Sequence, residues 1–155
     1  MLRKLVIGAL SAMAVSFSTT AFAQGTAAEA KAMLEKAVIA LKADKAKTLD
    51  MINKGEGGFL DRDLYVFCFN LSDGRAVAAG SENARKNLCL DLRTFKDATG
   101  KLYGPDLYAA GQKPEGQFTE VSYMFPKPGP DTTPVAKTSF VTKVADLGCG
   151  VGYYK

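Results

Sequence analysis

Three residues in the C-terminal part of the chain have types and spacing suited to binding a small carboxylate. Tyr123 and Phe125 are two positions apart, so in an extended strand their side chains point to one face. Lys137 follows in the next apolar run, with Ser139 on its own face. A lysine ammonium supplies charge, a phenol donates a hydrogen bond, and aromatic rings form a pocket wall. Spacing alone nevertheless favours ordinary core aromatics and a solvated edge lysine.

A second group with chemical potential is the acidic pair Asp61 and Asp63, which flank Arg62. Paired carboxylates can perform general acid–base catalysis or hold a cation. The plainer interpretation is a loop before a strand, in which Arg62 neutralises one of the acids. We favour the plainer interpretation because no other acid-rich segment supplies the further oxygen ligands that calcium requires. The sequence therefore predicts no metal site.

The chain contains no histidine. This absence excludes Ser-His-Asp and Cys-His catalytic pairs, histidine zinc sites and the c-type haem motif. The glycine-rich segment GEGG lacks the Lys-Ser/Thr ending of a phosphate-binding loop. We expect no catalytic residues, no cofactor and no enzymatic activity. A hydrolase or isomerase of unrecognised type is the remaining enzymatic hypothesis.

The N-terminal residues have the pattern of a secretory signal peptide. Arg3 and Lys4 precede an uncharged, mainly apolar stretch over residues 5–17, and Ala21-Phe22-Ala23 is an A-x-A cleavage site. The alternative is a membrane anchor, for which the apolar stretch is short. Cleavage after Ala23 predicts a periplasmic or secreted protein made of residues 24–155, without a further membrane span.

Cleavage also changes the charge and the chemistry open to the chain. Without Arg3 and Lys4 the net charge falls from +4 to about +2, which is too weak to indicate nucleic-acid binding. The three cysteines, Cys68, Cys89 and Cys149, would reach an oxidising compartment. They allow one disulfide and one free thiol, or three separate small core residues.

Hydrophobic periodicity predicts the elements that must position these residues. Thr26 and Glu29 fit a capping box before an amphipathic helix over residues 27–44, and a short helix over 46–52 follows. Residues 64–79 read as a β-hairpin, because Asp73-Gly74 is a strong hairpin turn between two strand-like runs.

The second half of the chain begins with an irregular insert over residues 81–111. Pro105 opens a helical turn there, and Gly111 closes it. Three strands then follow, over residues 118–125, 136–144 and 149–155. The order of helix, hairpin, insert and meander predicts one α+β domain with an antiparallel sheet.

Four segments resemble the single Cache domain, type 2. They are DRDLYVFCFNLSDGRAVAAG, KNLCLDLRTFKDATGKLYG, EVSYMFPKPG and KTSFVTKVADLGCGVGYYK, and the resemblance covers roughly residues 34–155. It implies a PAS-like fold, in which a long N-terminal helix packs on an antiparallel sheet of about five strands. It also implies an extracytoplasmic sensor of small molecules, here in a free-standing, secreted form.

The resemblance changes which interpretation of the candidate site is favoured, from ordinary core residues to a pocket wall. Such domains hold small organic acids and similar metabolites between the sheet and the insert. The aromatic strand motif of the family falls on Tyr123 and Phe125, with Phe where Trp is common, and its lysine falls on Lys137. These residues are then expected to form a pocket wall, and Tyr108 of the insert is the fourth predicted ligand-binding residue. The segment AAGSENARKN departs from the family because it is short and lacks a histidine.

The resemblance also implies how the chain ends. A PAS-like order places the last strand beside the first, so Cys68 and Cys149 come within disulfide range and Cys89 is left free. Gly148, Gly150 and Gly152 share a face, which leaves room for a close approach. We expect the N-terminal helix to fill it, with a ligand as the alternative.

Two roles follow from the sequence. The first is a periplasmic domain that binds a small molecule, most simply a carboxylate, without catalysis. The second is an accessory protein that binds and modulates a membrane sensor kinase or chemoreceptor.

Overall fold

The computed structural model describes residues 23–155, so the predicted signal peptide, apart from Ala23, lies outside the described residues. Helix α1 (Ala27–Ala43) begins at Thr26. The Thr26 hydroxyl accepts from the backbone N–H of Glu29, and the Glu29 carboxylate accepts from the N–H of Thr26. The predicted capping box is therefore confirmed.

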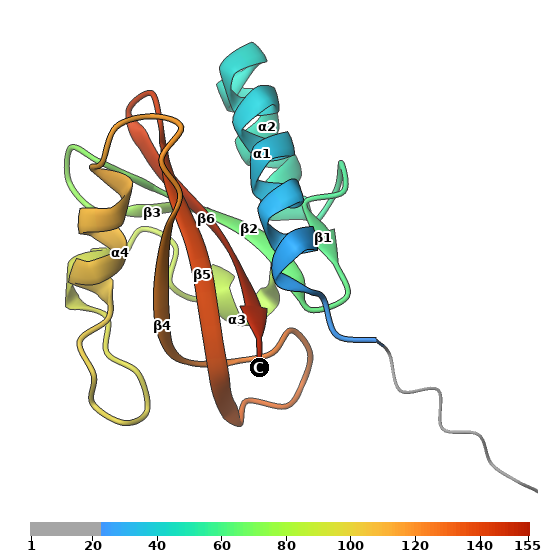
Figure 1. The fold of residues 1–155 in the computed structure, drawn as a ribbon, viewed down its shortest axis with the longest axis vertical. Helices are drawn as coiled ribbons and strands as arrows, with labels where there is room; N and C mark the ends of the chain where they lie inside the picture. Colours follow the sequence, from blue (N-terminus) through green and yellow to red (C-terminus); the bar gives the residue numbers. More distant parts are fainter. Residues whose placement is uncertain (1–22) are drawn as a thin grey trace, which may run out of the picture.

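Helix α2 (Lys45–Lys54) follows α1 after a single residue, Asp44, whose side chain accepts from the N–H of Lys47. It ends at Gly55, which has a φ of 70°. The two helices pack against each other and overlap in the view of Figure 1. Within residues 23–155, no helix has the length and apolar character that crossing a membrane requires.

The strands form a six-stranded antiparallel sheet in the order β1-β2-β6-β5-β4, with β3 paired to β2. The strands are β1 (Leu60–Asp61), β2 (Leu64–Asn70), β3 (Ala76–Ala79), β4 (Thr119–Pro126), β5 (Pro134–Val144) and β6 (Leu147–Tyr154). The predicted hairpin, the meander and the placement of the last strand beside the first long strand are confirmed. The two-residue β1 is the one strand beyond the expected five.

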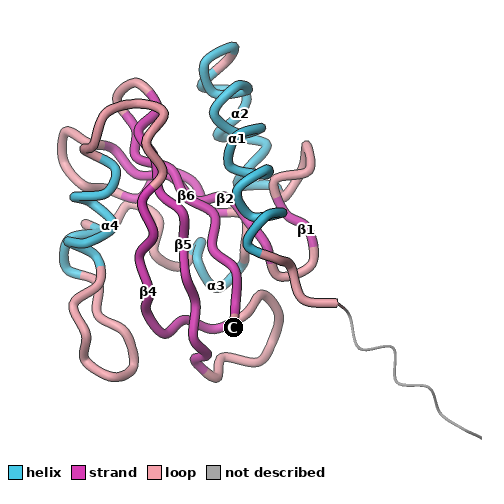
Figure 2. Tube along the Cα trace, in the orientation of Figure 1, coloured by secondary structure: helices cyan, strands magenta, loops and turns pink. Residues whose placement is uncertain are grey.

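Between β3 and β4 lies the insert, which holds α3 (Glu82–Arg85), the short 3-10 helix η1 (Leu92–Thr94) and α4 (Gly104–Gly111). Pro105 stands in the first turn of α4, as its fixed φ favours. Helices α1 and α2 cover one face of the sheet, and α4 covers the other (Figures 1 and 2). Helix α4 and the N-terminal helices therefore lie on opposite sides, whereas Arg85 of α3 donates a hydrogen bond to the carbonyl of Asn53 in α2.

Alternation along β2 divides its side chains between two cores. Val66 and Cys68 pack with α1, whereas Phe69 packs with α4 and η1. Tyr65 and Phe67 share the face of Phe69, because successive strand residues point to opposite faces. The face toward the insert is thus lined with aromatic rings.

A disulfide joins the two central strands on the α1 side. Cys68 of β2 lies directly opposite Cys149 of β6, and their sulfur atoms are bonded. Both residues are fully buried, while Cys89 is free and exposed. The predicted pairing is confirmed.

The alternate glycines of β6 face the insert and not α1, which makes the expected occupant wrong. A Cβ added at Gly150 would lie 2.5 Å from the ring of Phe67, and one added at Gly152 would meet the side chain of Lys137. Alternation predicts which residues share a face, but it does not say which layer covers that face. The close approach is made by side chains of the neighbouring strands.

Candidate ligand-binding site

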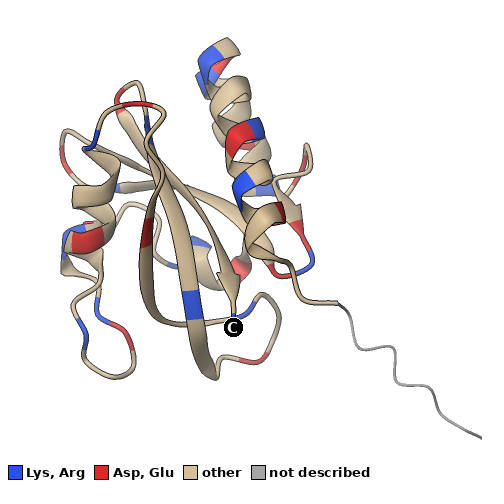
Figure 3. Cartoon of the chain, viewed as in Figure 1, with Lys and Arg blue, Asp and Glu red and all other residues tan. Residues whose placement is uncertain are grey.

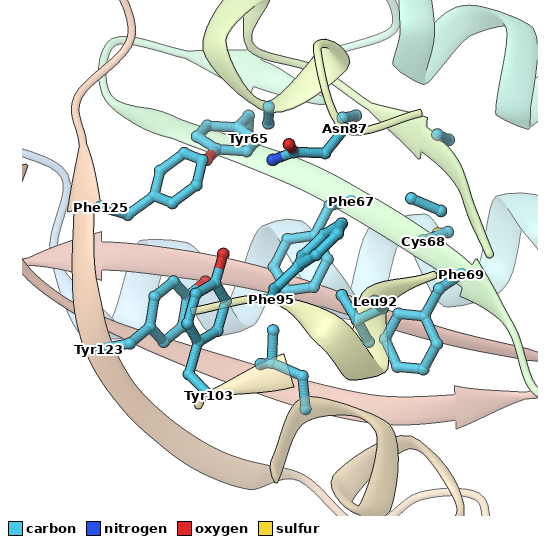
Figure 4. A pocket seen from close by; sticks show the side chains of 15 residues that line it. Tyr65, Phe67, Cys68, Phe69, Asn87, Leu92, Phe95, Tyr103, Tyr123 and Phe125 are labelled. Carbon is cyan, nitrogen blue, oxygen red and sulfur yellow. The ribbon is translucent and has the colours of Figure 1, made fainter. Parts of the chain in front are cut away.

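A cavity lies between the sheet and the insert, and aromatic side chains dominate its wall (Figure 4). Its free volume is about 40 Å³, enough for a few water molecules or a very small solute. Strand β2, the insert and strand β4 all contribute to the lining. The aromatic residues are Tyr65, Phe67, Phe69, Phe95, Tyr103, Tyr123 and Phe125.

Lys137 stands behind this wall on β5, the strand between β6 and β4. It lies opposite Tyr123 of β4 and opposite Tyr154 of β6. Its exposed fraction is 1%. Charged residues gather on the helices and loops and are sparse on the strands (Figure 3). A buried lysine on a strand therefore stands apart from the other charges.

The ammonium of Lys137 is surrounded by aromatic groups. Its Nζ donates a hydrogen bond of 2.7 Å to the hydroxyl of Tyr65. It also lies 4.0 Å from the ring centre of Tyr65, 5.1 Å from that of Phe125 and 5.2 Å from that of Tyr154. All three distances are within the range of cation–π attraction. Lys137 does not line the cavity itself but reaches it through Tyr65 and Phe125, which do.

Burial without a close counter-ion changes the acidity of Lys137. Desolvation lowers its pKa to about 7, and the negative charge of Asp63 opposes that shift. Among residues 23–155, no carboxylate oxygen lies within 4.0 Å of this ammonium. The site thus has a cation that the described part of the chain does not pair with an anion.

The phenols around the cavity are kept neutral. Burial raises the pKa of Tyr103 to about 12 and raises the pKa values of Tyr65 and Tyr123 well above the ordinary range. The hydroxyl of Tyr123 is 2.9 Å from the hydroxyl of Ser139, and its ring stacks on Tyr103 at 4.2 Å between centres. Neutral phenols are hydrogen-bond donors, which is what a bound carboxylate requires.

The structure brings together three of the four residues predicted to bind the ligand. Tyr123 and Phe125 line the cavity, with their rings edge to face at 6.2 Å, and Lys137 contacts Phe125 from behind. Tyr108 does not join them. Its hydroxyl donates a hydrogen bond to the backbone carbonyl of Leu71 at 2.6 Å, and the guanidinium of Arg93 lies over its ring, 5.3 Å from the ring centre.

Several lining residues were missed by sequence reasoning. Tyr65 and Phe67 share one face of a strand predicted correctly, so the alternation of β2 marks them as candidates. Tyr103 and Asn87 come from the insert, where no periodic pattern exists to single them out. Figure 4 shows the amide of Asn87 among the rings on the insert side of the cavity.

The acidic pair before β2 is divided between two roles. Arg62 bonds Asp61 at 2.9 Å and Glu29 of α1 at 2.6 Å, which agrees with the loop interpretation. Asp63 is buried and accepts a hydrogen bond from the backbone N–H of Gly25. Within the described residues, no cluster of three or more potential metal ligands occurs.

Three solved structures share the fold of this chain. One is a periplasmic sensor domain of a chemotaxis protein, 23% identical over 80% of this chain and 86% of its own, with a TM-score of 0.59. The second is a methyl-accepting chemotaxis protein from Vibrio parahaemolyticus RIMD 2210633, 21% identical over 82% and 86%, with a TM-score of 0.64. The third is a Cache chemosensory domain described as a structural basis for carboxylic acid recognition. It is 23% identical over 80% and 84%, with a TM-score of 0.57.

No protein-family model and no curated protein matches the sequence. The solved structures nevertheless cover most of the chain, and each superimposes over most of its own length. The architecture is thus a known one, with a helix on one face of an antiparallel sheet and an insert on the other face. Residues 23–155 have the fold of a periplasmic Cache sensor domain.

Proposed function

We propose that this protein is a periplasmic binding domain for a small organic carboxylate and that it senses this ligand without catalysing a reaction. The observation that carries the proposal is the buried ammonium of Lys137, which has no carboxylate within 4.0 Å among residues 23–155 and stands behind an aromatic cavity. A buried cation is costly until an anion pairs with it. A carboxylate is the simplest ligand that meets this need.

The arrangement of donors supports an anionic head group with a short apolar tail. The carboxylate would approach Lys137 from the cavity and accept from the phenols of Tyr65 and Tyr123. The rings of Phe67 and Phe125 would contact the tail. The free volume of about 40 Å³ favours the shortest acids unless the insert moves outward.

A thermal-shift screen tests the proposal. Acetate, propionate and lactate are compared with acetamide, propionamide and lactamide, which have nearly the same shape but no charge. A ligand that binds only the folded state raises the melting temperature by mass action. We expect a rise with at least one acid and none with its amide. Equal shifts with acid and amide would show that charge is not recognised, and no shift with any acid would contradict the proposal.

The accessory role at a membrane sensor kinase or chemoreceptor uses the same site. In that case ligand binding would change the affinity of the domain for the receptor. Capture of a receptor of this class that depends on an acid identified in the screen would favour the accessory role.

A further inference from the structure

Asp63, beside the N-terminal end of α1, has one carboxylate oxygen without a partner. Its exposed fraction is 9%. Oδ1 accepts from the backbone N–H of Gly25 at 2.7 Å. Oδ2 is buried and has no hydrogen-bond partner among the described residues. A buried carboxylate oxygen left in this state costs free energy, so a missing donor is indicated.

The cationic side chains of the neighbouring elements do not form an ion pair with Asp63. The guanidinium of Arg62 is taken up by Asp61 and Glu29. Lys127 lines the same hollow, but its ammonium lies over the ring of Tyr154. Among residues 23–155, no lysine or arginine nitrogen lies within 4.0 Å of the Asp63 carboxylate.

The chain just before α1 is held in place at Gly25. This residue is buried, and a Cβ added to it would lie 2.6 Å from Cδ2 of Leu64, so the backbone passes too close for any side chain. Consecutive Cα atoms are about 3.8 Å apart, and Gln24 directly precedes Gly25. The backbone nitrogen of Gln24 must therefore lie near Asp63, whose carboxylate binds Gly25. A hollow of about 350 Å³ adjoins both and is lined by Gln24, Asp63 and Lys127 among others.

We propose that removal of the signal peptide after Ala23 creates an α-ammonium on Gln24 that binds the free Oδ2 of Asp63. The step is hydrolysis of the Ala23–Gln24 peptide bond. Water adds its hydroxyl to the carbonyl carbon of Ala23 as the C–N bond breaks. The nitrogen of Gln24 takes the remaining proton of the water and the proton of the new carboxylic acid, so Ala23 leaves as a carboxylate. An amide nitrogen with one N–H thereby becomes an ammonium with three, so a donor appears where Asp63 lacks one.

The mature protein then has an interaction that the precursor cannot make. A charge-assisted bond between the first residue and the loop before β2 holds the start of α1 against the sheet. Asp63 also acts on Lys137 through its charge. The same carboxylate thus connects the processed N-terminus with the ligand site.

The test measures the pKa of the Gln24 α-amine by NMR in exported, processed protein. Mass spectrometry first establishes that the chain begins at Gln24 with a free amine. An ordinary α-amine has a pKa of about 7.7–8.0, and a carboxylate partner should raise it by about one unit or more. Asp63→Asn should return it to the ordinary range. Asp61→Asn, which removes an exposed carboxylate two positions away, is the matched control and should leave it raised.

A second measurement separates the effect of the terminal charge from any effect of the Asp63→Asn substitution on the fold. Enzymatic cyclisation of Gln24, in which the α-amine attacks the side-chain amide and releases ammonia, gives a chain of the same length without the ammonium. We expect cyclisation to lower the melting temperature of wild-type protein by several degrees but to leave the Asp63→Asn variant unchanged. An ordinary α-amine pKa in wild type, equal losses in both proteins, or a mature chain that begins elsewhere would overturn the proposal.

Discussion

The ammonium of Lys137 is enclosed, and its close neighbours are aromatic rings and one phenol oxygen. Removing an ammonium from water costs several kcal/mol even after relaxation. Contact with ring faces returns about 2 kcal/mol when the cation is desolvated. The remaining cost stays in the ligand-free protein, and the proposed carboxylate would offset it on binding. In the proposed role, Lys137 therefore lowers the stability of the ligand-free protein and contributes to the affinity for the ligand.

Burial of Lys137 should make the stability of the ligand-free protein depend on pH. In the unfolded chain Lys137 keeps its proton up to its ordinary pKa of 10.5, whereas burial lowers the pKa to about 7 in the folded protein. The unfolded state binds more protons between these pH values, so the contribution of Lys137 to the free energy of unfolding rises with pH across this window. Urea unfolding at about pH 7 and about pH 9 measures it. In the Lys137→Met variant this contribution should be absent. If wild type and variant had the same pH dependence, the lysine would not be buried as described.

The second prediction concerns affinity. A carboxylate binds the charged lysine, so its affinity should be constant below about pH 7 and fall above it by up to about tenfold per pH unit. Above pH 7, binding should also be accompanied by proton uptake, which calorimetry in buffers of different ionisation enthalpy detects. An affinity that stays flat from pH 6 to pH 9 would contradict the role of Lys137.

At the scale of elements, β6 holds the two faces of the sheet together. It pairs with β2 on one side and β5 on the other, carries Cys149 toward α1 and presents its glycines toward the insert. The missing side chains of Gly150 and Gly152 leave the space that Phe67 and Lys137 fill. The aromatic wall and the buried lysine both depend on this stripe of glycine.

Substituting Gly150 should therefore destabilise the protein. In Gly150→Ala, the new Cβ would lie 2.5 Å from the ring of Phe67 and 2.8 Å from the carbonyl oxygen of Phe140. Overpacking of this kind costs about 1–3 kcal/mol of unfolding free energy, which denaturant unfolding measures. Glu120→Ala, at an exposed position of β4, is the control and should change stability by less than about 0.5 kcal/mol. Equal stability of the two variants would show that β6 does not need glycine there.

The disulfide between β2 and β6 should also contribute to stability. It joins residues 81 positions apart, and closing a loop of that length restricts the unfolded chain. Cys68→Ala combined with Cys149→Ala should lower the unfolding free energy by about 2–5 kcal/mol. Cys89→Ser, which replaces the free and exposed cysteine, should have little effect. A double variant as stable as wild type would contradict the contribution of the disulfide.

Local patterns were sufficient to predict most of these elements. The capping box at Thr26 and the turn at Asp73-Gly74 are short-range features, so the sequence contains what is needed to recognise α1 and the hairpin. The neighbours of β6 are far away in sequence, and their placement came from the resemblance to a known family. The side of the sheet that its glycines face depends on packing between layers, and there the sequence-based expectation was wrong.

In the molecule as a whole, the two faces of the sheet are covered by cores of different composition. On one face, α1 and α2 cover an aliphatic core that contains the disulfide. On the other face, the insert covers an aromatic core that contains the cavity. The regular elements hold Lys137, Tyr123 and Phe125 in register. The insert supplies Tyr103 and Asn87 to the cavity wall.

This division also explains how far the site could be predicted. Tyr123, Phe125 and Lys137 lie on strands, where alternation and strand order place side chains, and the structure brings them together. Tyr108 lies on α4, whose rotation relative to the sheet depends on packing that sequence patterns do not encode. Its hydroxyl bonds Leu71 instead. Residues of the insert can be assigned to the site only with coordinates.

Recognition of a carboxylate by Lys137 can be measured by calorimetric titration with acetate and propionate. Wild-type protein is compared with Lys137→Met and with Lys143→Met, which removes a half-exposed lysine from the same strand. Losing the buried partner of a bound anion should weaken binding by about 30-fold or more, whereas Lys143→Met should bind like wild type. Equal affinity in wild type and Lys137→Met, or no binding of either acid by wild type, would contradict the account.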